Sequence, residues 1–128
     1  MARRTIDFDA KDLAAQLETL APDEIDTLPF GVIHLDDEFT VLLYSKVEAA
    51  QSGFGRQPIG EKFFSLTRRK MNTEDFRGRI ERAMADGNVE LEFAWVGDYG
   101  DAKRELRVRV LSASGGGVWM CIERDSGR

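Results

Sequence analysis

The spacing of apolar side chains predicts helical structure near the start of the chain. Leu13, Leu17 and Leu20 recur at helical spacing within residues 9–20, with polar residues on the opposite face. Pro22 ends this pattern, and residues 24–28 predict a second short helical turn. Packing against the rest of the domain is the favoured interpretation of this segment. A dimer contact is the alternative, because the same periodicity fits both.

From residue 30 the apolar pattern changes to a period of two, which is typical of strands. The turn-forming run Asp36-Asp37-Glu38 separates two such segments, so residues 30–36 and 39–44 predict a hairpin. In the first strand, one face carries Ile33 and Leu35, and the other carries Val32 and His34.

The middle of the chain predicts short helical turns followed by one longer helix. Residues 45–67 are irregular and rich in glycine, yet they carry several apolar side chains that suit a core. Residues 74–86 then place apolar side chains on one helical stripe. Asn72 or Thr73 can cap the start of this helix, and Gly87 suits its C-terminal end.

Three strands are predicted to close the chain, within residues 89–95, 105–110 and 118–124. In the second of these, Arg107 and Arg109 alternate with apolar residues and are expected to pair across to Glu90 and Glu92 on the first. In the last strand, Val118, Met120 and Ile122 share one face, with Trp119 and Cys121 on the other.

The predicted order gives an α+β fold: a five-stranded antiparallel sheet with helices on one face and an N-terminal helical segment. This is the order of PAS domains. We expect an N-terminal helical cap at 1–27 and a PAS domain at 28–128.

Size and charge narrow the class of protein. The 128 residues suit one domain, and the net charge of −5 disfavours a nucleic-acid binder. The N-terminus lacks the apolar core of a signal peptide, and no apolar run is long enough to cross a membrane. A single cysteine also fits a reducing compartment. These features predict a cytoplasmic protein.

Several runs resemble the photoactive yellow protein family over almost the whole chain, from about residue 10 onward. They are Leu28-Pro29-Phe30-Gly31-Val32-Ile33-His34-Leu35-Asp36, Gly60-Glu61-Lys62-Phe63-Phe64, Phe76-Arg77-Gly78, Ala85-Asp86-Gly87-Asn88-Val89 and the closing run 119–124. In that family p-coumaric acid is attached to a cysteine by a thioester, and a tyrosine and a protonated glutamic acid hold its phenolate oxygen. The resemblance places Tyr44 and Glu48 at those two positions.

The attachment position departs from the family pattern. Lys70 stands where the resemblance places the cysteine, and the one thiol, Cys121, lies on the last strand. A thioester is therefore not expected, and a Schiff base on Lys70 is disfavoured because Arg68 and Arg69 flank it. The arginine that covers the chromophore aligns with Phe54, and an aromatic residue of a loop aligns with Gly97.

Candidate site residues follow from the pattern and the resemblance together. Tyr44 and Glu48 form either a structural hydrogen-bonded pair or a retained ligand site. The candidates for the pocket lining are Ile33, Tyr44, Glu48, Phe54, Phe63, Phe64 and Trp95. The basic run Arg68, Arg69 and Lys70 is either a solvated loop or a docking patch for an acidic partner.

No catalytic or metal-binding pattern is visible in the sequence. His34, the one histidine, alternates with core residues and is expected at the surface rather than as a haem or metal ligand. Cys121 is expected to be half-buried and lacks the context of flavin-adduct cysteines. We therefore expect no enzyme, and no p-coumaric acid, haem, flavin or metal cofactor.

The sequence favours a free-standing PAS sensor and regulator in bacterial signal transduction. It would act by protein–protein interaction with a sensor kinase or another regulator, or by forming a homodimer through the N-terminal helix or the sheet. A small non-covalent ligand is one candidate input. The alternative is a blue-light photoreceptor whose chromophore is held unconventionally.

Overall fold

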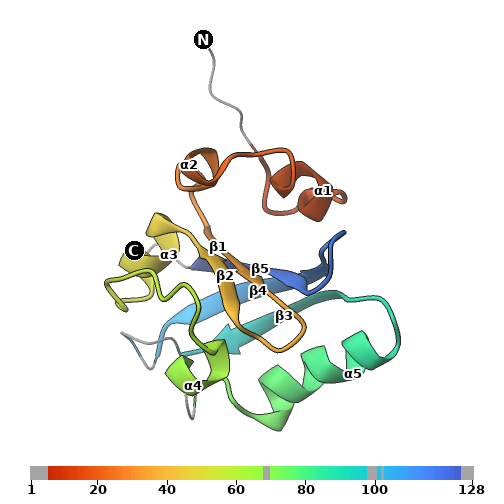
Figure 1. The fold of residues 1–128 in the computed structure, drawn as a ribbon. Coiled ribbons are helices and arrows are strands. Elements are labelled where there is room, and N and C mark those ends of the chain that lie inside the picture. Colours follow the sequence, from red (N-terminus) through yellow and green to blue (C-terminus); the bar gives the residue numbers. More distant parts are fainter. Residues whose placement is uncertain (1–5, 68–69, 98–100, 102, 125–128) are drawn as a thin grey trace.

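The computed structural model describes residues 6–67, 70–97, 101 and 103–124, and these residues form one antiparallel sheet with the strand order β2-β1-β5-β4-β3 (Figure 1). Strands β1 and β5 lie side by side and pair antiparallel, from Gly31 opposite Ile122 to Leu35 opposite Val118. The predicted α+β class and five antiparallel strands are confirmed. The strands are β1 Gly31–Leu35, β2 Val41–Tyr44, β3 Glu90–Val96, β4 Glu105–Ser112 and β5 Val118–Arg124.

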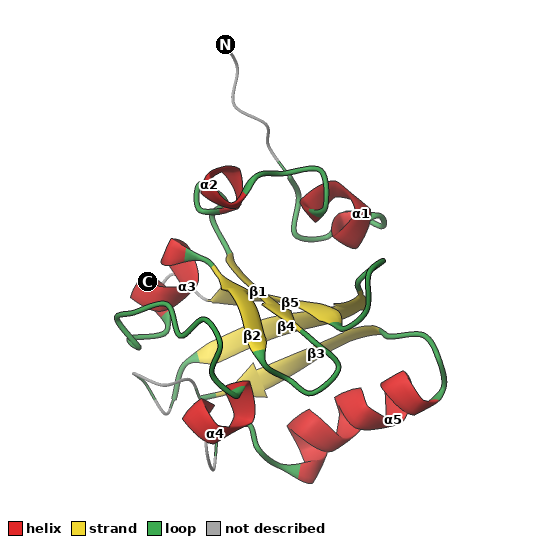
Figure 2. Ribbon diagram, in the orientation of Figure 1, coloured by secondary structure: helices red, strands yellow, loops and turns green. Residues whose placement is uncertain are grey.

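Each face of the sheet has its own apolar core. Ile33, Leu35 and Met120 face the main core together with α4 (Phe63–Thr67) and α5 (Arg79–Ala85). Val32 and Trp119 face a second core, which the N-terminal segment covers. Figure 2 shows the sheet lying between the two groups of helices. The predicted alternation along β1 and β5 is therefore correct, but both faces are buried.

The helix predicted at residues 74–86 is present, with an unexpected first turn. Residues Glu74–Gly78 form a π-helical turn (η1), and α5 continues from it. The Thr73 hydroxyl oxygen accepts from the Phe76 N–H at 3.1 Å, which confirms one of the two predicted caps. Phe76 is fully buried and makes edge contacts with Trp95 and Phe93, at centroid distances of 5.0 and 5.4 Å.

The N-terminal segment packs on the sheet, as the favoured interpretation predicted, but its helices are shorter than expected. The helix predicted over 9–20 is only Leu13–Leu17 (α1), and Pro22–Ile25 forms α2. The chain before α1 instead follows the sheet, since Phe8 is buried and stacks edge-on against Phe30 at 5.3 Å. Packing on the second core decides these bounds, because so short a helix has little stability of its own.

Polar side chains of the sheet hold this N-terminal segment in place. Buried Arg109 donates to the carbonyl oxygens of Phe8 and Ala10, at 2.6 and 2.8 Å. The Glu18 carboxylate accepts from the Trp119 indole N–H and from the Ser114 N–H, both at 2.9 Å. The Ser114 backbone and the Trp119 side chain together lower the pKa of Glu18.

Three sequence predictions for this face are wrong or incomplete. His34 is half-buried rather than on the surface, and its ring stacks on Trp119 at 4.3 Å. Cys121 is fully buried rather than half-buried, and burial raises its thiol pKa to about 12. Arg107 binds Glu92 as expected, whereas Arg109 binds the N-terminal backbone instead of a glutamate. All three differences have one cause. The N-terminal segment packs against the face of the sheet that carries Trp119 and Cys121, and the alternation of apolar residues alone predicts that this face is exposed to solvent.

The β1–β2 hairpin is confirmed, although β2 starts later than predicted. Asp36 accepts from the Thr40 and Glu38 N–H groups, and the Thr40 bond is the largest cause of its lowered pKa. Phe39 has φ 64°, which is uncommon for a non-glycine residue and keeps it out of the strand. Strand β2 lies at the edge of the sheet, and the following loop pairs with its outer side. The Val41 N–H donates to the Glu61 carbonyl, and the Val41 carbonyl accepts from the Gly60 N–H.

Candidate ligand-binding site

Ser45 fixes the short helix α3 (Lys46–Gln51) against β1. Its hydroxyl oxygen accepts from the Glu48 N–H and from the Val32 N–H, both at 3.1 Å, and its own N–H donates to the Val32 carbonyl at 2.9 Å. Ser45 is fully buried. These bonds hold Glu48, in the first turn of α3, directly over β1.

Glu48 is bound to Arg124 at the end of β5. The guanidinium Nη1 and Nη2 atoms donate to Oε1 and Oε2, each at 2.8 Å. The two side chains are 1% and 3% exposed, so the pair is buried. Two parallel charge-assisted hydrogen bonds favour the carboxylate form, which accepts and does not donate. In this structure Glu48 is therefore an acceptor, unlike the protonated donor that the family resemblance implies.

Gly31 makes room for that pair. A Cβ atom at Gly31 would lie only 1.8 Å from Oε1 of Glu48 and 2.9 Å from its carboxyl carbon. A larger residue at this position would therefore push the carboxylate away from Arg124. The glycine is required here by close approach of a side chain.

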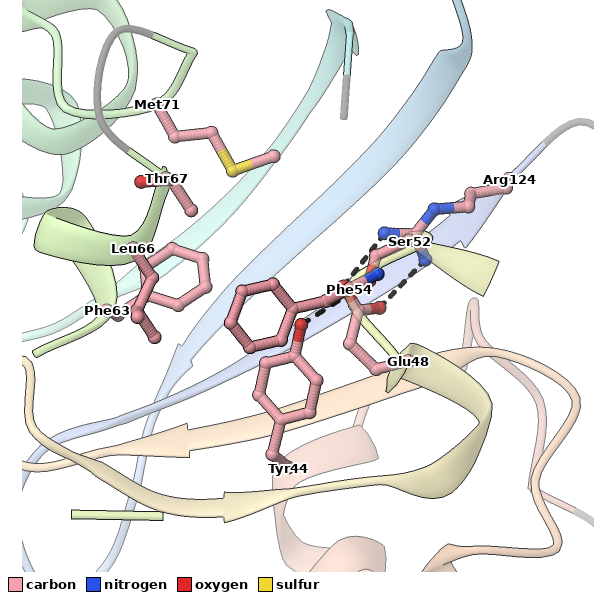
Figure 3. A pocket seen from close by; sticks show the side chains of 9 residues that line it. All are labelled: Tyr44, Glu48, Ser52, Phe54, Phe63, Leu66, Thr67, Met71 and Arg124. Atoms are coloured by element: carbon pink, nitrogen blue, oxygen red, sulfur yellow. Dashed lines mark hydrogen bonds and ion pairs between the residues drawn. The ribbon is translucent and has the colours of Figure 1, made fainter. Parts of the chain in front are cut away.

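A cavity of about 30 Å³ lies beside the buried pair (Figure 3). This volume holds about two water molecules, because one water needs roughly 10–15 Å³. The Tyr44 and Ser52 hydroxyl oxygens are 3.5 Å apart at one end of it. The Thr67 hydroxyl is buried and has no hydrogen-bond partner among the described residues. The lining residues are Tyr44, Glu48, Ser52, Phe54, Phe63, Leu66, Thr67, Met71 and Arg124.

The structure brings together four of the seven predicted lining residues: Tyr44, Glu48, Phe54 and Phe63. The other three lie outside this cavity. Ile33 and Phe64 are buried in the main core, and Trp95 packs against that core from β3.

Five lining residues were missed from the sequence. Ser52 had a signal, since it follows Glu48 at an i, i+4 spacing. Arg124 had none, because its contact with Glu48 joins residues 76 positions apart. The five are Ser52, Leu66, Thr67, Met71 and Arg124.

Lys70 lies on the turn after α4 and is exposed. Its N–H donates to the Thr67 carbonyl at 3.1 Å, so the turn between two cavity-lining residues, Thr67 and Met71, carries the lysine. Arg68 and Arg69, the other members of the predicted docking patch, lie outside the described residues. Gly97, which the family resemblance aligns with an aromatic residue of a loop, directly follows β3 and has a φ angle of 104°.

The described part of the chain was also searched for groups of metal-binding side chains and for membrane-spanning helices. There, no three His, Cys, Asp or Glu side chains are grouped as a metal site would require. The same residues contain no helix with the length and apolar character needed to span a membrane.

Comparison with known proteins identifies the family. Photoactive yellow protein from Rhodothalassium salexigens is 31% identical over 121 residues, which cover 93% of this chain and 97% of that protein. The chain belongs to the photoactive yellow protein family. The photoactive yellow protein of Halochromatium salexigens is 29% identical over 124 residues, with the same coverage of 93% and 97%. No protein-family model matches the chain.

Solved structures of a photoactive yellow protein domain and of a PAS domain share the fold of this chain. The photoactive yellow protein domain of the sensor histidine kinase Ppr from Rhodospirillum centenum matches with a TM-score of 0.76 and 25% identity, over 86% of this chain and 98% of that domain. The PAS domain of an HTR-like protein from Haloarcula marismortui has a TM-score of 0.54 at 14% identity, over 91% and 100%. The predicted resemblance and the PAS fold are confirmed.

Proposed function

We propose that this chain is a non-enzymatic sensor and regulator whose input is a small molecule held without a covalent bond. The observation that carries the proposal is the cavity between Tyr44, Phe63 and the buried Glu48–Arg124 pair. A concave, mainly apolar space with a few convergent polar groups is the usual form of a ligand site. A PAS sheet around it can transmit occupancy as a shift between conformations.

The surroundings of Lys70 support non-covalent binding. Its side chain is exposed on the turn after α4, whereas the cavity lies on the side of Thr67 and Met71. Lys70 is not among the side chains that line the cavity, and a thioester requires a thiol. Cys121 is buried in the second core, on the opposite face of the sheet.

We further propose that the output is contact with a protein, such as a sensor kinase or another regulator. A relative of known structure is a domain of a sensor histidine kinase, which supports this kind of partner. The basic run Arg68, Arg69 and Lys70 is the proposed docking patch for an acidic surface on the partner.

Two measurements on protein from its native cells test this function. Native mass spectrometry is expected to show a bound small molecule, and a pull-down is expected to recover a regulator with the wild-type protein and less of it with Glu48→Gln. The exposed Glu74→Gln is the matched control, since Glu74 also forms an arginine pair, with Arg82, and neither residue lines the cavity. Only apo protein, together with equal recovery by all three proteins, would contradict the proposal.

The second candidate function is a blue-light photoreceptor with an unconventionally held chromophore. Family membership favours it, because the relatives are photoactive yellow proteins. The purified protein would then gain an absorption band in the blue after incubation with activated p-coumaric acid, and light would bleach the band. A colourless product excludes this candidate, and the absence of Soret or flavin bands excludes haem and flavin in the same spectrum.

A further inference from the structure

The two edges of the sheet differ in what covers them. At one edge, the outer side of β2 and the residue before it pair with the backbone of residues 60–62. At the other edge lies β3, which pairs with β4 alone among the described residues (Figure 1). No backbone hydrogen bond between described residues reaches the outer side of β3. A long edge strand with unpaired N–H and C=O groups is a template for a further strand.

Every second residue of β3 directs its backbone groups to this open edge. At one end of the ladder with β4, the Ser112 N–H donates to the Val89 carbonyl. At the other end, the Gly97 N–H donates to the Arg104 carbonyl. Alternate residues of an antiparallel ladder bond to the same partner strand, so the odd-numbered residues of β3 bond to β4 and the even-numbered ones point outward. The outward residues, all exposed, are Glu90, Glu92, Ala94 and Val96.

The order of these four residues is complementary to itself. When two copies of β3 lie antiparallel with Phe93 on the two-fold axis, Glu92 stands opposite Ala94 of the other copy. Glu90 then stands opposite Val96, every outward N–H and C=O has a partner, and no two carboxylates face each other. Sliding the strands by two residues either opposes the two copies of Glu92 or leaves Glu90 beyond the end of the other strand. One register is therefore favoured.

The same register covers half-exposed apolar side chains on the face that carries α5. Phe93 and Trp95 are half-buried at the margin of the main core. The pairing brings Phe93 against Phe93 of the other copy, and Trp95 against Leu91. Cross-strand aromatic and aliphatic pairs of this kind stabilise a sheet. The Arg79 guanidinium lies 4.3 Å from the centroid of the Phe93 ring, and its two copies are the like charges that this contact has to accommodate.

On the opposite face, Arg107 of β4 supplies a cation to the other copy. It binds Glu92 of its own chain at 2.9 Å, and it also binds Asp9 and Glu123. Ala94 pairs with Arg107, so it lies between that arginine and Glu92 of the other copy. The two Cα atoms are then about 10 Å apart, a distance that an arginine and a glutamate side chain span together. The small alanine leaves room for them to meet above it.

From these observations we propose that the outer edge of β3 is an interface between two copies of this chain, which join their sheets across a two-fold axis at Phe93. Such an interface uses the same residues of both copies. A second copy fits this edge because its own strand places uncharged residues opposite both glutamates. The inference goes beyond the proposed function and does not depend on it, since no residue of the cavity takes part.

Sedimentation velocity over a wide range of protein concentrations tests for the dimer, and the wild type is expected to pass reversibly from monomer to dimer. Proline is tolerated on an edge strand where its missing N–H faced outward. Ala94→Pro therefore keeps the ladder with β4 and is expected to weaken the dimer at least about tenfold, because the N–H is lost at two symmetric places. Ala94→Ser keeps the N–H and is the matched control, with the dimer expected to persist.

Charges placed at Val96 test the register. Val96 is 62% exposed, so a charged side chain there disturbs no core. Val96→Glu would oppose Glu90 of the other copy and is expected to weaken the dimer several-fold, whereas Val96→Lys is expected to strengthen it. Combining Glu90→Lys with Val96→Glu is expected to restore the dimer. Circular dichroism establishes that each variant is folded, and the Val96 series stands by itself if Ala94→Pro does not fold.

The outcomes separate the possible occupants of this edge. A dimer that Ala94→Pro weakens and that follows the charge at Val96 supports the proposal. A wild type that stays monomeric at every concentration overturns it and leaves the edge open to a strand of another protein. A dimer that is insensitive to both sets of variants also overturns it, because the two copies then meet elsewhere, as through the N-terminal segment. A dimer sensitive to Ala94→Pro alone overturns the register at Phe93.

Discussion

Gly31 on β1 lies so close to Glu48 on α3 that a methyl group on the glycine would be 1.8 Å from the carboxylate oxygen Oε1. The same carboxylate makes both hydrogen bonds to Arg124. The absence of a side chain at one position of β1 therefore allows the buried carboxylate on α3 to reach its partner on β5. This contact joins the start of β1, the first turn of α3 and the end of β5.

The first prediction concerns that contact. Gly31→Ala is expected to displace Glu48 from Arg124 and to lower the free energy of unfolding by about 3 kcal/mol, which is typical of breaking a buried ion pair. Urea denaturation followed by circular dichroism measures this. Gly115→Ala is the control, because a Cβ there meets no atom within 4 Å. Equal unfolding midpoints for the two variants would show that the glycine is not needed.

The second prediction concerns Glu18 and acid stability. Its pKa is lower in the folded protein than the ordinary value of 4.5, mainly because the Ser114 N–H donates to it. A lowered folded pKa stabilises the protein above the unfolded pKa, and this contribution is lost as the pH falls through the folded pKa. The stability difference between wild type and Glu18→Gln is therefore expected to shrink from about pH 6 to about pH 3.

Urea titrations at a series of pH values give that difference directly. Glu90→Gln, which changes an exposed glutamate on β3, serves as the control. A wild-type minus Glu18→Gln difference that stays constant over the whole range would refute the stabilising role of this carboxylate.

The third prediction concerns the thiol of Cys121. Burial raises its pKa to about 12, so at neutral pH it is protonated and shielded from reagents. Iodoacetamide is expected to leave the native protein unmodified over hours and to label it fully in guanidinium chloride. Mass spectrometry counts the adducts. Labelling of the native protein at the rate of an unfolded peptide would mean that the second core is open.

The fourth prediction concerns the attachment of the N-terminal segment. Arg109→Gln removes the buried donor to the Phe8 and Ala10 carbonyls and is expected to speed chymotrypsin cleavage at Phe8 several-fold. Arg79→Gln, which alters an arginine on α5 in the opposite layer, is the control. Unchanged cleavage in Arg109→Gln would show that apolar contacts alone hold the segment.

The sequence was most informative where a pattern is local. Alternation in β1 and β5, the stripe through Phe76 and Ile80, and the Thr73 cap all depend on neighbours within a few residues, and each is found in the structure. The site was only partly predictable. Tyr44 and Glu48 are close in sequence, and both line the cavity. Arg124 reaches it from the last strand, which no local pattern shows.

Exposure was the least predictable property, for a physical reason. Alternation tells which residues share a face of a strand, but whether that face meets water depends on what packs against it. Here the segment from Ile6 to Leu28 covers the face that carries His34, Trp119 and Cys121. From the sequence, His34 was therefore expected at the surface and Cys121 half-buried, whereas His34 is half-buried and Cys121 is fully buried.

By itself, the sequence determined the order of the elements, the PAS frame and the presence of two polar residues at 44 and 48. The tertiary structure alone decided the binding partner of Glu48. Its carboxylate lies over Gly31 and binds Arg124, so the contact joins distant parts of the chain. The reason is that propensity and periodicity act within a few residues, whereas the charge partner of a buried carboxylate is set by how the strands and helices pack.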